Sequence, residues 1–252
     1  MAVGRTNASA KGGVTPDDSR NPFLNGDITF NAPWQVGYEV YDGVLYAEAI
    51  IVKSGTLTVS KQYLMDLWMI GGGGGDAVAN NYYQNKQEGR GGGGSGHTTL
   101  ALAVTLTVGT HAVTIGAVGA NKTVKCGTEP AGTYSGTAGG TTTLGEQSAN
   151  GGSPGSVSIY GSSGSSGCNG RSGGAGGSKG GTVSTTSIMT APGENGTPGD
   201  GYIMSRFRDA AHNEDYGRTG TGVSSVKGGG WGLNGSGYGS GTSGALVIRI
   251  AV

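Results

Sequence analysis

Alternating apolar and polar positions mark two segments of the chain as β-strands. In TLALAVTLTVG (residues 99–109) the even-numbered positions are Leu or Val, and Ala or Thr stands between them. In ALVIRIAV (residues 245–252) the even-numbered positions are again aliphatic. A two-residue period is typical of a strand with one buried face. We therefore predict such a strand in each segment.

Further strand signals lie in the first half of the chain. DITFNAPWQVGYEVYDGVLYAEAIIVKSG (27–55), GTLTVS (55–60) and YLMDLWMI (63–70) are bounded by Gly, Asn-Gly or Asp-Gly turns. AVTIGAV (112–118) follows the strand at 99–109 after a predicted turn at 109–111. No segment shows the 3.6-residue period of a helix. The pattern predicts an all-β, sandwich-like platform with essentially no α-helix.

The chain changes character between Gly119 and Gly244. Glycine stands at every third position from 161 to 176, and the same period returns at 193–199. Collagen also has this period but needs abundant proline, and the whole chain has only 7. Polyproline II helices have three residues per turn and leave their amides and carbonyls free to pair with neighbouring helices. The period therefore predicts a bundle of glycine-rich polyproline II helices.

The alternative interpretation of these glycines is a flexible Gly/Ser linker. The regular triplets, and the return to a strand at 245–252, favour an enclosed bundle instead. LWMIGGGGGDAV (67–78) would then be the point where a strand becomes a glycine helix, and Asp76 would open the first recognition loop.

Composition supports a structure that depends on backbone hydrogen bonds. Glycine supplies 56 of the 252 residues, and hydrophobic residues make up only 34%. This apolar content is too low for a conventional core through the whole chain. Buried amides and carbonyls all need partners, and a glycine-helix bundle supplies them.

Charge and cysteine content exclude several classes of partner. The 16 basic and 16 acidic residues balance, and no basic block stands out, so we expect neither nucleic-acid nor anionic-membrane binding. No apolar stretch is long enough to span a membrane, and the first residues lack the apolar region of a secretory signal. Cys126 and Cys168 lie in Gly/Ser/Thr-rich segments, where we expect free thiols.

The predicted organisation has two parts. Residues 1–43 are assigned to an N-terminal arm or attachment segment, because their beginning is polar and contains Pro16 and Pro22. Residues 44–252 form the glycine-rich β and polyglycine-helix domain. Its predicted loops are 76–90, 120–135, 183–192 and 202–218.

The order of these motifs resembles a known family. GTLTV, MDLWMIGGGGG, GRGGGGSG, LTVGTHAVTIGAVG and GWGLNGSGYGSGTSGALVIRI follow one another as in the glycine-rich domain of bacteriophage tail and receptor-binding proteins. The matching positions are Gly55–Val59, Leu67–Gly75, Val113–Gly119 and Ser243–Ile250, and the likeness covers residues 54–252. A looser likeness is to tail-fibre-tip adhesins, in which loops at the end of a polyglycine sandwich contact the host.

The resemblance implies a non-catalytic phage tail-tip or tail-fibre adhesin, located in the virion tail and assembled in the host cytoplasm. Its implied partners are a bacterial surface receptor, either a glycan or an outer-surface protein, and other tail proteins bound through the N-terminal arm. A homotrimer is a candidate assembly. The alternative function is a structural virion protein such as a head fibre or capsid decoration. Ice binding through flat Ala/Thr/Ser faces is a weaker third hypothesis, because Arg171 and Lys179 interrupt the glycine run.

Motifs for catalysis lack the context that they need. G-x-S-x-G occurs at 151–155 and 176–180, but neither copy lies between a strand and a helix. The three histidines, His97, His111 and His212, show no metal-ligand spacing. The carboxylates of Asp200, Asp209, Glu214 and Asp215 could cleave a glycan, but solvated loop charges explain them better. We expect no enzyme activity, no metal and no cofactor.

Candidate receptor-binding residues interrupt the glycine-rich segments. Aromatic and Arg side chains in loops on a rigid base are common anchors of recognition surfaces, and Tyr gives a large contact area at low entropic cost. Tyr134 in AGTYSG belongs to the same group of aromatic residues. Some of these rings could instead cover the bundle or its junction with the platform, and Trp231 could pack on glycine backbone. The predicted contact residues are Asn81, Tyr82, Tyr83, Lys86, Arg206, Phe207, Arg208, His212, Tyr216, Trp231 and Tyr238.

Overall fold

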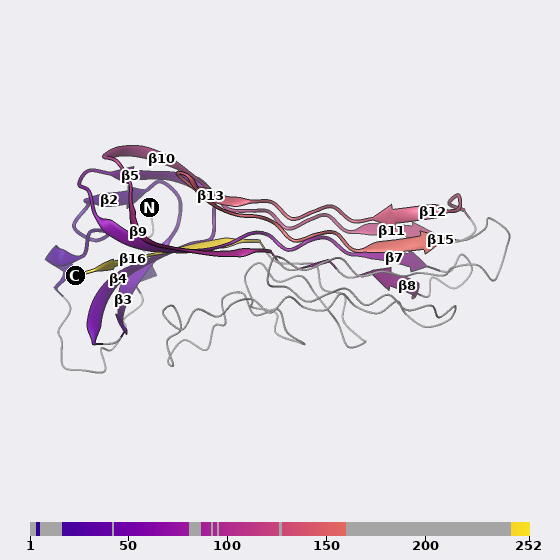
Figure 1. The fold of residues 1–252 in the computed structure, drawn as a ribbon, viewed down its shortest axis with the longest axis horizontal. Coiled ribbons are helices and arrows are strands. Elements are labelled where there is room, and N and C mark those ends of the chain that lie inside the picture. Colours follow the sequence, from indigo (N-terminus) through magenta and orange to yellow (C-terminus); the bar gives the residue numbers. More distant parts are fainter. Residues whose placement is uncertain are drawn as a thin grey trace.

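The computed structural model describes residues 4–5, 17–41, 43–80, 87–91, 93–94, 96–125, 128–159 and 243–252. These residues form an elongated molecule with a β-sheet platform at one end, a narrow stalk, and a small tip at the other end (Figure 1). Apart from one 3-10 turn, η1 (Asp18–Arg20), the regular elements of the described chain are strands. The predicted all-β class is confirmed.

The larger platform sheet has six strands. Their order is β1 (Gly4–Arg5), β3 (Gln35–Tyr41), β4 (Val44–Ile51), β16 (Ala245–Ala251), β6 (Leu64–Ile70) and β9 (Thr98–Thr105). β1 pairs with β3 in parallel, and the other pairs are antiparallel. The C-terminal strand β16 therefore lies inside the sheet, hydrogen-bonded to β4 on one side and to β6 on the other.

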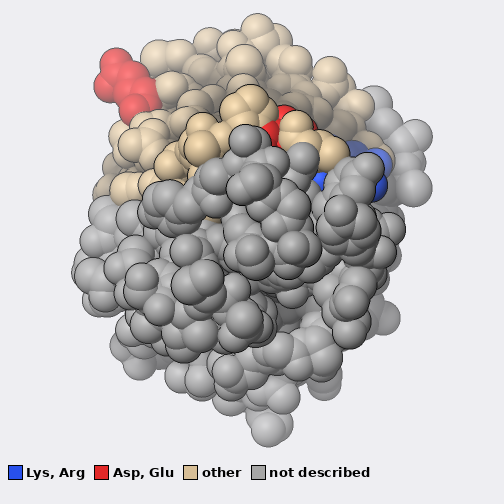
Figure 2. Space-filling model, turned by 90° about the vertical axis from the view of Figure 1, so that its right-hand side faces the viewer, with Lys and Arg blue, Asp and Glu red and all other residues tan. Residues whose placement is uncertain are grey.

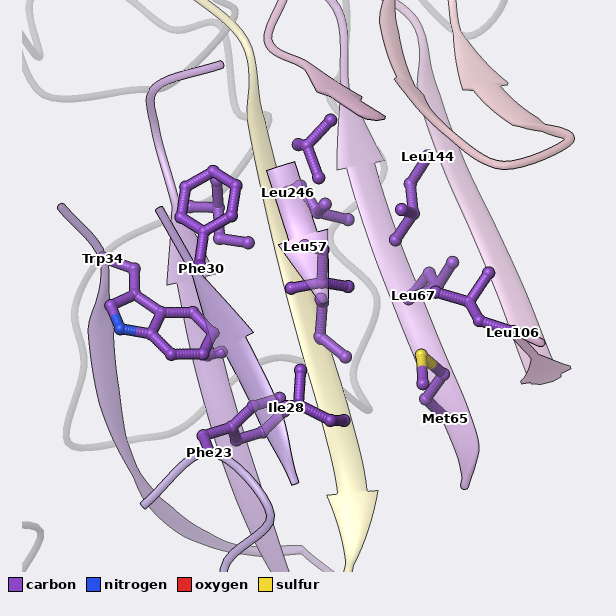
Figure 3. Packing of buried hydrophobic residues seen from close by; sticks show 14 of the residues in the cluster. Phe23, Ile28, Phe30, Trp34, Leu57, Met65, Leu67, Leu106, Leu144 and Leu246 are labelled. Atoms are coloured by element: carbon purple, nitrogen blue, oxygen red, sulfur yellow. The ribbon is translucent and has the colours of Figure 1, made fainter. Parts of the chain in front are cut away.

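The smaller platform sheet has five antiparallel strands. Their order is β14 (Gln147–Ala149), β13 (Thr142–Leu144), β10 (Gly109–Thr114), β5 (Gly55–Val59) and β2 (Ile28–Phe30). The two sheets bury one apolar cluster between them, to which almost every strand contributes alternate residues (Figure 3). Leu246, Ile248 and Ile250 lie in this cluster, and Val252 packs against it, which confirms the predicted face of the C-terminal strand.

The N-terminal boundary predicted at residue 43 is wrong for the described residues that precede it. β2 and β3 belong to the platform sheets, and Phe23 and Trp34 are buried in the core. The two rings meet edge to face, 5.6 Å apart (Figure 3). The segment before residue 43, which is largely polar in sequence, therefore contributes a few large aromatic side chains to the core. Each of these side chains buries a large apolar area.

The single buried face predicted for residues 99–109 is also wrong. Strand β9 pairs with β6 through a bulge opposite Asp66, where the register shifts between Met65 and Leu67. Ala103 adopts a left-handed φ of 53°, and its N–H donates to the Asp66 carboxylate at 3.0 Å. A bulge places two residues opposite one and interrupts the alternation. Leu102 is consequently 47% exposed.

The predicted turn at 109–111 is displaced towards the N-terminus. Gly109 and His111 belong to β10, where they pair with Val59 and Leu57 of β5. β9 ends at Thr105, so the chain reverses over 106–108, and Val108 in this reversal is 62% exposed. Gly109 has a φ of +140°, which suits glycine at the start of the new strand.

A buried ion pair sets the register of the three central strands of the larger sheet. Arg249 of β16 lies opposite Glu48 of β4 and Asp66 of β6. Its Nε donates to a carboxylate oxygen of Glu48 at 2.6 Å, and Arg249 is only 3% exposed. Removing one partner of such a pair leaves a buried charge, so a shifted register of β16 is strongly disfavoured.

The stalk consists of extended glycine-rich segments that continue the platform strands. They are residues 71–76, 93–94 with 96–97, 115–121, 136–141 and 150–155, and we call them glycine helices. The segment 71–76 is buried along its whole length and pairs with the other four.

Hydrogen-bond partners in the stalk recur every three residues. Gly72 N donates to Gly140 O at 2.9 Å, and three residues later Gly75 N donates to Thr137 O at 2.9 Å. Similarly, the carbonyls of Gly72 and Gly75 accept from the amides of Gly152 and Gly155. Three residues per turn is the period of a polyproline II helix, so the predicted bundle is present in the described chain. The repeat at 161–176, from which it was predicted, lies outside the described residues.

Close approach of the backbones explains the glycines of the stalk. A Cβ on Gly72 would lie 2.0 Å from the carbonyl oxygen of Ala117, and a Cβ on Gly75 would lie 2.1 Å from that of Ala120. Segment 71–76 has neighbours on several sides, and a Cβ on Gly71 or Gly74 would likewise lie 2.0 Å from a carbonyl oxygen, so four of the five consecutive glycines are explained by close approach. An outer helix needs glycine only on its inner face, and the side chains of Ala117 and Ala120 are exposed.

We expect Gly72→Ala to destabilise the protein strongly, because the added methyl group meets a carbonyl oxygen. Overpacking of this kind costs ~1–3 kcal/mol or more, which at ~2–4 °C per kcal/mol lowers the melting temperature by several degrees. Ser153→Thr is the control, because it adds a methyl group at an exposed stalk position. Equal melting temperatures for the two variants would contradict close packing.

The pair Asp27–Tyr63 predicts a pH dependence of stability. The Tyr63 hydroxyl donates to the Asp27 carboxylate, which is the main cause that lowers the pKa of Asp27. Burial, together with this bond, raises the pKa of Tyr63. The pair therefore stabilises the fold above the ordinary Asp pKa of about 4 and below the ordinary Tyr pKa of about 10.

We expect Tyr63→Phe to lower the melting temperature at pH 7. The difference from the wild type should shrink as the pH falls below about 4, because Asp27 then becomes protonated. Thermal melts of both proteins from pH 2 to pH 8 measure this. A difference that stays constant over that range would show that the bond makes no charge-dependent contribution.

Candidate recognition surface at the distal tip

The distal tip consists of five short strands, each continuing a glycine helix of the stalk. β11 (Lys122–Lys125), β7 (Ala77–Asn80) and β8 (Gln87–Gly91) form a three-stranded sheet in that order. β12 (Gly132–Ser135) and β15 (Ser156–Ile159) form an antiparallel pair beside it (Figure 1). The predicted loops 76–90 and 120–135 therefore contain two strands each.

A second, small apolar core holds the tip strands together. Ala77, Ala79, Val124, Val157 and Ile159 are all at most 1% exposed. They come from β7, β11 and β15, so the cluster links the two tip sheets. The tip thus has a core of its own, separate in space from the platform core, and its reversals rest on a packed base.

Asp76 joins the stalk to the tip. It is 3% exposed, and its carboxylate accepts the Gly93 N–H at 2.8 Å. Its own N–H donates to the Asn121 side chain, and its carbonyl accepts the Lys122 N–H, each at 2.8 Å. The prediction that a recognition loop opens at Asp76 is wrong, because Asp76 is buried at the end of the central glycine helix and strand β7 begins at the next residue.

Tyr134 supports the tip from within. Its ring packs against the small apolar core, and its hydroxyl donates to the carbonyl of Pro130 at 2.9 Å. This bond fixes the reversal at 128–131, between β11 and β12. Tyr134, which the sequence grouped with the aromatic residues of the recognition segments, therefore packs on the core of the tip itself.

The described surface of the tip is polar and carries little charge. Lys122 and Lys125 stand at the two ends of β11 and are exposed, as is Thr123 between them. On the neighbouring pair of strands, the hydroxyls of Thr133 and Ser158 are 3.0 Å apart and hydrogen-bonded. Seen from the distal end, most of the described surface is neither acidic nor basic (Figure 2). Because Glu129 in the reversal 128–131 is also partly exposed, hydroxyls and charges of both signs suit a polar partner.

All eleven predicted contact residues lie outside the described residues. Asn81, Tyr82, Tyr83 and Lys86 fall in the sequence between Asn80 and Gln87, which are paired between β7 and β8. The other seven, Arg206, Phe207, Arg208, His212, Tyr216, Trp231 and Tyr238, fall between Ile159 and Ser243. The predicted loops 183–192 and 202–218, and both cysteines, lie outside as well.

Sequence reasoning missed the residues of the described tip surface. Lys122 and Lys125 fell in a segment predicted only as a loop, although a signal was available. Two lysines flank a β-branched pair in KTVK, directly after the glycine triplets of 115–121. Thr133 and Ser158, two more residues of this surface, lie in separate four-residue strands. Each strand is surrounded by Gly and Ser, so its period is too short to recognise in the sequence.

Of the catalytic motifs considered, the copy of G-x-S-x-G at 176–180, His212 and the carboxylates of Asp200, Asp209, Glu214 and Asp215 lie outside the described residues. Ser153 of the G-x-S-x-G motif at 151–155 is exposed on the stalk, and its carbonyl accepts the Gly94 N–H. His111 Nε2 lies 2.7 Å from the carbonyl of Thr107. Within the described ranges, no three His, Cys, Asp or Glu side chains gather to hold a metal ion. The groups whose pKa is shifted, such as Asp17 and Tyr38, lie near the platform.

Comparisons with known proteins agree with this architecture. The chain matches the glycine-rich domain family over residues 52–248, and it belongs to that family. The match begins just after β4, includes the platform strands from β5 onwards, the stalk and the tip, and ends within the closing strand β16. No curated protein matches the chain. None of the described helices is long and apolar enough to cross a membrane.

We expect Ile159→Ala to loosen the tip while the platform stays folded, because Ile159 belongs only to the tip core. Such a truncation costs about 2–5 kcal/mol. Amide exchange should therefore accelerate in β11, β12 and β15 but not in β16. Thr123→Ala, at an exposed position of β11, is the matched control. Uniform acceleration over the whole chain would show that the tip has no core of its own.

Proposed function

We propose that the protein is a phage tail-tip or tail-fibre adhesin that attaches the virion to a bacterial surface receptor through the distal tip. The resemblance to the glycine-rich domain of phage tail and receptor-binding proteins motivates this proposal. The observation that carries it is the stalk. Glycine helices, held in register by sheets at both ends, carry a separately packed tip away from the platform (Figure 1).

The construction suits recognition more than catalysis. Binding residues often sit on reversals that a rigid scaffold positions. Here the central helix 71–76 is buried and paired with its neighbours, so the tip is held firmly against the pull of an attached virion. The described tip exposes hydroxyls and two lysines, which are groups that bind glycan hydroxyls and anionic substituents. We infer a non-enzymatic role without a metal or cofactor.

The remaining partners follow from the same proposal. In this proposal the platform, which lies at the end opposite the tip, would face the rest of the tail, and the N-terminal residues would contact other tail or fibre proteins. A homotrimer would present three tips together and raise the avidity for a repetitive cell surface. The protein would act in the virion tail after assembly in the host cytoplasm, without nucleic-acid binding or membrane insertion.

Adsorption to bacterial envelopes tests the proposal. We expect the triple variant Tyr82→Ala, Tyr83→Ala, Phe207→Ala to bind envelopes of a susceptible host at least about tenfold more weakly, because hot-spot aromatic residues each contribute about 1–2 kcal/mol or more. Thr110→Ala, on an exposed platform position, should bind like the wild type.

Circular dichroism and melting temperatures show whether each variant is folded. Undiminished binding by the folded triple variant would contradict the assignment of these residues. A wild-type protein that binds no envelope at all would contradict the adhesin function and favour the alternative, a structural virion component such as a head fibre or capsid decoration.

A further inference from the structure

Continuous backbone joins the platform to the tip along several glycine helices (Figure 1). β6 continues through 71–76 into β7, and β10 continues through 115–121 into β11. In the same way 136–141 joins β12 to β13, and 150–155 joins β14 to β15. Tension applied between the two ends of the molecule therefore acts on covalent chain along the whole stalk.

The glycine helices are already close to their greatest length. A polyproline II helix rises about 3.1 Å per residue, and a fully extended chain reaches about 3.3–3.6 Å per residue. The stalk can therefore lengthen by only about a tenth. An α-helix, which rises about 1.5 Å per residue, could more than double its length under the same tension. With so little slack in the backbone, tension acts at once on the contacts between the helices.

The hydrogen bonds of helix 150–155 resist sliding along the stalk. Gly152 N donates to Gly72 O at 2.8 Å, and Gly152 O accepts the Gly139 N–H at 2.9 Å. One triplet further on, Gly155 makes the corresponding two bonds with the same two neighbouring segments. These bonds run from helix to helix, across the stalk, so sliding along the stalk strains both levels together. Gly152 and Gly155 are buried, which keeps water from replacing the bonds one by one.

Apolar side chains anchor the same helix at both ends. Ala149 of β14 lies in the platform core, and Val157 and Ile159 of β15 lie in the tip core. Sliding of 150–155 would have to pull these buried groups out of place. In addition, the bonds repeat every three residues, so a slip restores them only after about 9 Å.

We propose that the stalk is a mechanical element that transmits tension between a partner bound at the tip and an attachment at the platform. Tension along the stalk loads the hydrogen bonds of a helix in shear, all at the same time. Pulling two tip strands apart instead loads the bonds nearest the tip first and the deeper ones afterwards. The stalk therefore resists an axial pull much more strongly than a sideways pull at the tip.

The inference goes beyond adhesion, which concerns only what the tip binds. A protein that binds no bacterial envelope could still transmit tension between two parts of a virion. Conversely, a tip on a mechanically weak stalk could still bind a receptor. The test therefore uses the isolated protein without a receptor, so that its outcome is separate from that of the adsorption experiment.

Single-molecule force spectroscopy with two matched pairs of handles tests the proposal. The axial variant carries Ser158→Cys in the tip and Thr110→Cys in the platform. The lateral variant carries Ser158→Cys and Thr123→Cys, both in the tip. Thr110 and Thr123 are exposed residues of β10 and β11, the two strands that one glycine helix joins, so the variants differ mainly in the direction of the pull. Both variants also carry Cys126→Ser and Cys168→Ser, so that the handles attach only at the chosen positions.

We expect the axial variant to open at a force several times larger than the lateral variant. It should lengthen by no more than about a tenth before it opens. An axial opening force equal to or below the lateral force, or a much larger gradual lengthening, would overturn the proposal. Circular dichroism shows whether each variant is folded. If Thr110→Cys disturbs the fold, Ala112→Cys at another exposed position of β10 takes its place.

A substitution in the stalk gives a second measurement on the axial variant. A Cβ on Gly151 would lie 1.9 Å from the carbonyl oxygen of Gly139, so Gly151→Ala forces 150–155 away from its neighbour. We expect this change to lower the axial opening force, whereas Ser153→Ala at an exposed stalk position should leave it unchanged. Equal axial forces for the two variants would overturn the role of the closely packed bonds. If Gly151→Ala does not fold, the comparison of axial and lateral forces still decides.

Discussion

Hydrogen bonds between glycine backbones are the interaction on which this structure depends. Each is worth only about 1 kcal/mol net, but an unpaired buried amide or carbonyl costs about 1–3 kcal/mol. The central helix 71–76 is buried on all sides, so its polar groups must be paired. They can be paired only where no Cβ separates neighbouring backbones. Gly71, Gly72, Gly74 and Gly75, which look flexible in the sequence, are therefore required by close packing.

The platform and the tip make the stalk possible. A glycine helix has no internal hydrogen bonds, and a short one has little to fix its register. Here β6, β9, β10, β13 and β14 hold one end of the five described helices, and tip strands hold the other end. Side-chain burial in the platform and the tip thus sets the register of the glycine helices. In that register their backbone amides and carbonyls can pair. The Arg249–Glu48 ion pair also helps to set the register, because it fixes the position of β16 in the larger platform sheet.

Much of this architecture could be predicted from the sequence, because its physical signals are local. Three-residue glycine spacing predicted the helix bundle, and alternation at 245–252 predicted the closing strand. The bulge at Ala103 could not be predicted, since it depends on the Asp66 carboxylate of a neighbouring strand. Phe23 and Trp34 lie in polar surroundings in the sequence, without a periodic apolar pattern. Their burial in the core could therefore not be predicted. The tip strands are too short to show a period.

The central claim is that the polyglycine segment is a paired helix and not a flexible connection. NMR couplings across hydrogen bonds test this directly, since they connect an amide nitrogen to the carbonyl carbon of its acceptor. The structure predicts couplings from Gly72 to Gly140 and, three residues later, from Gly75 to Thr137. Detecting both would confirm the three-residue period. Their absence, with exchange at Gly72 and Gly75 as fast as in an unfolded chain, would contradict it.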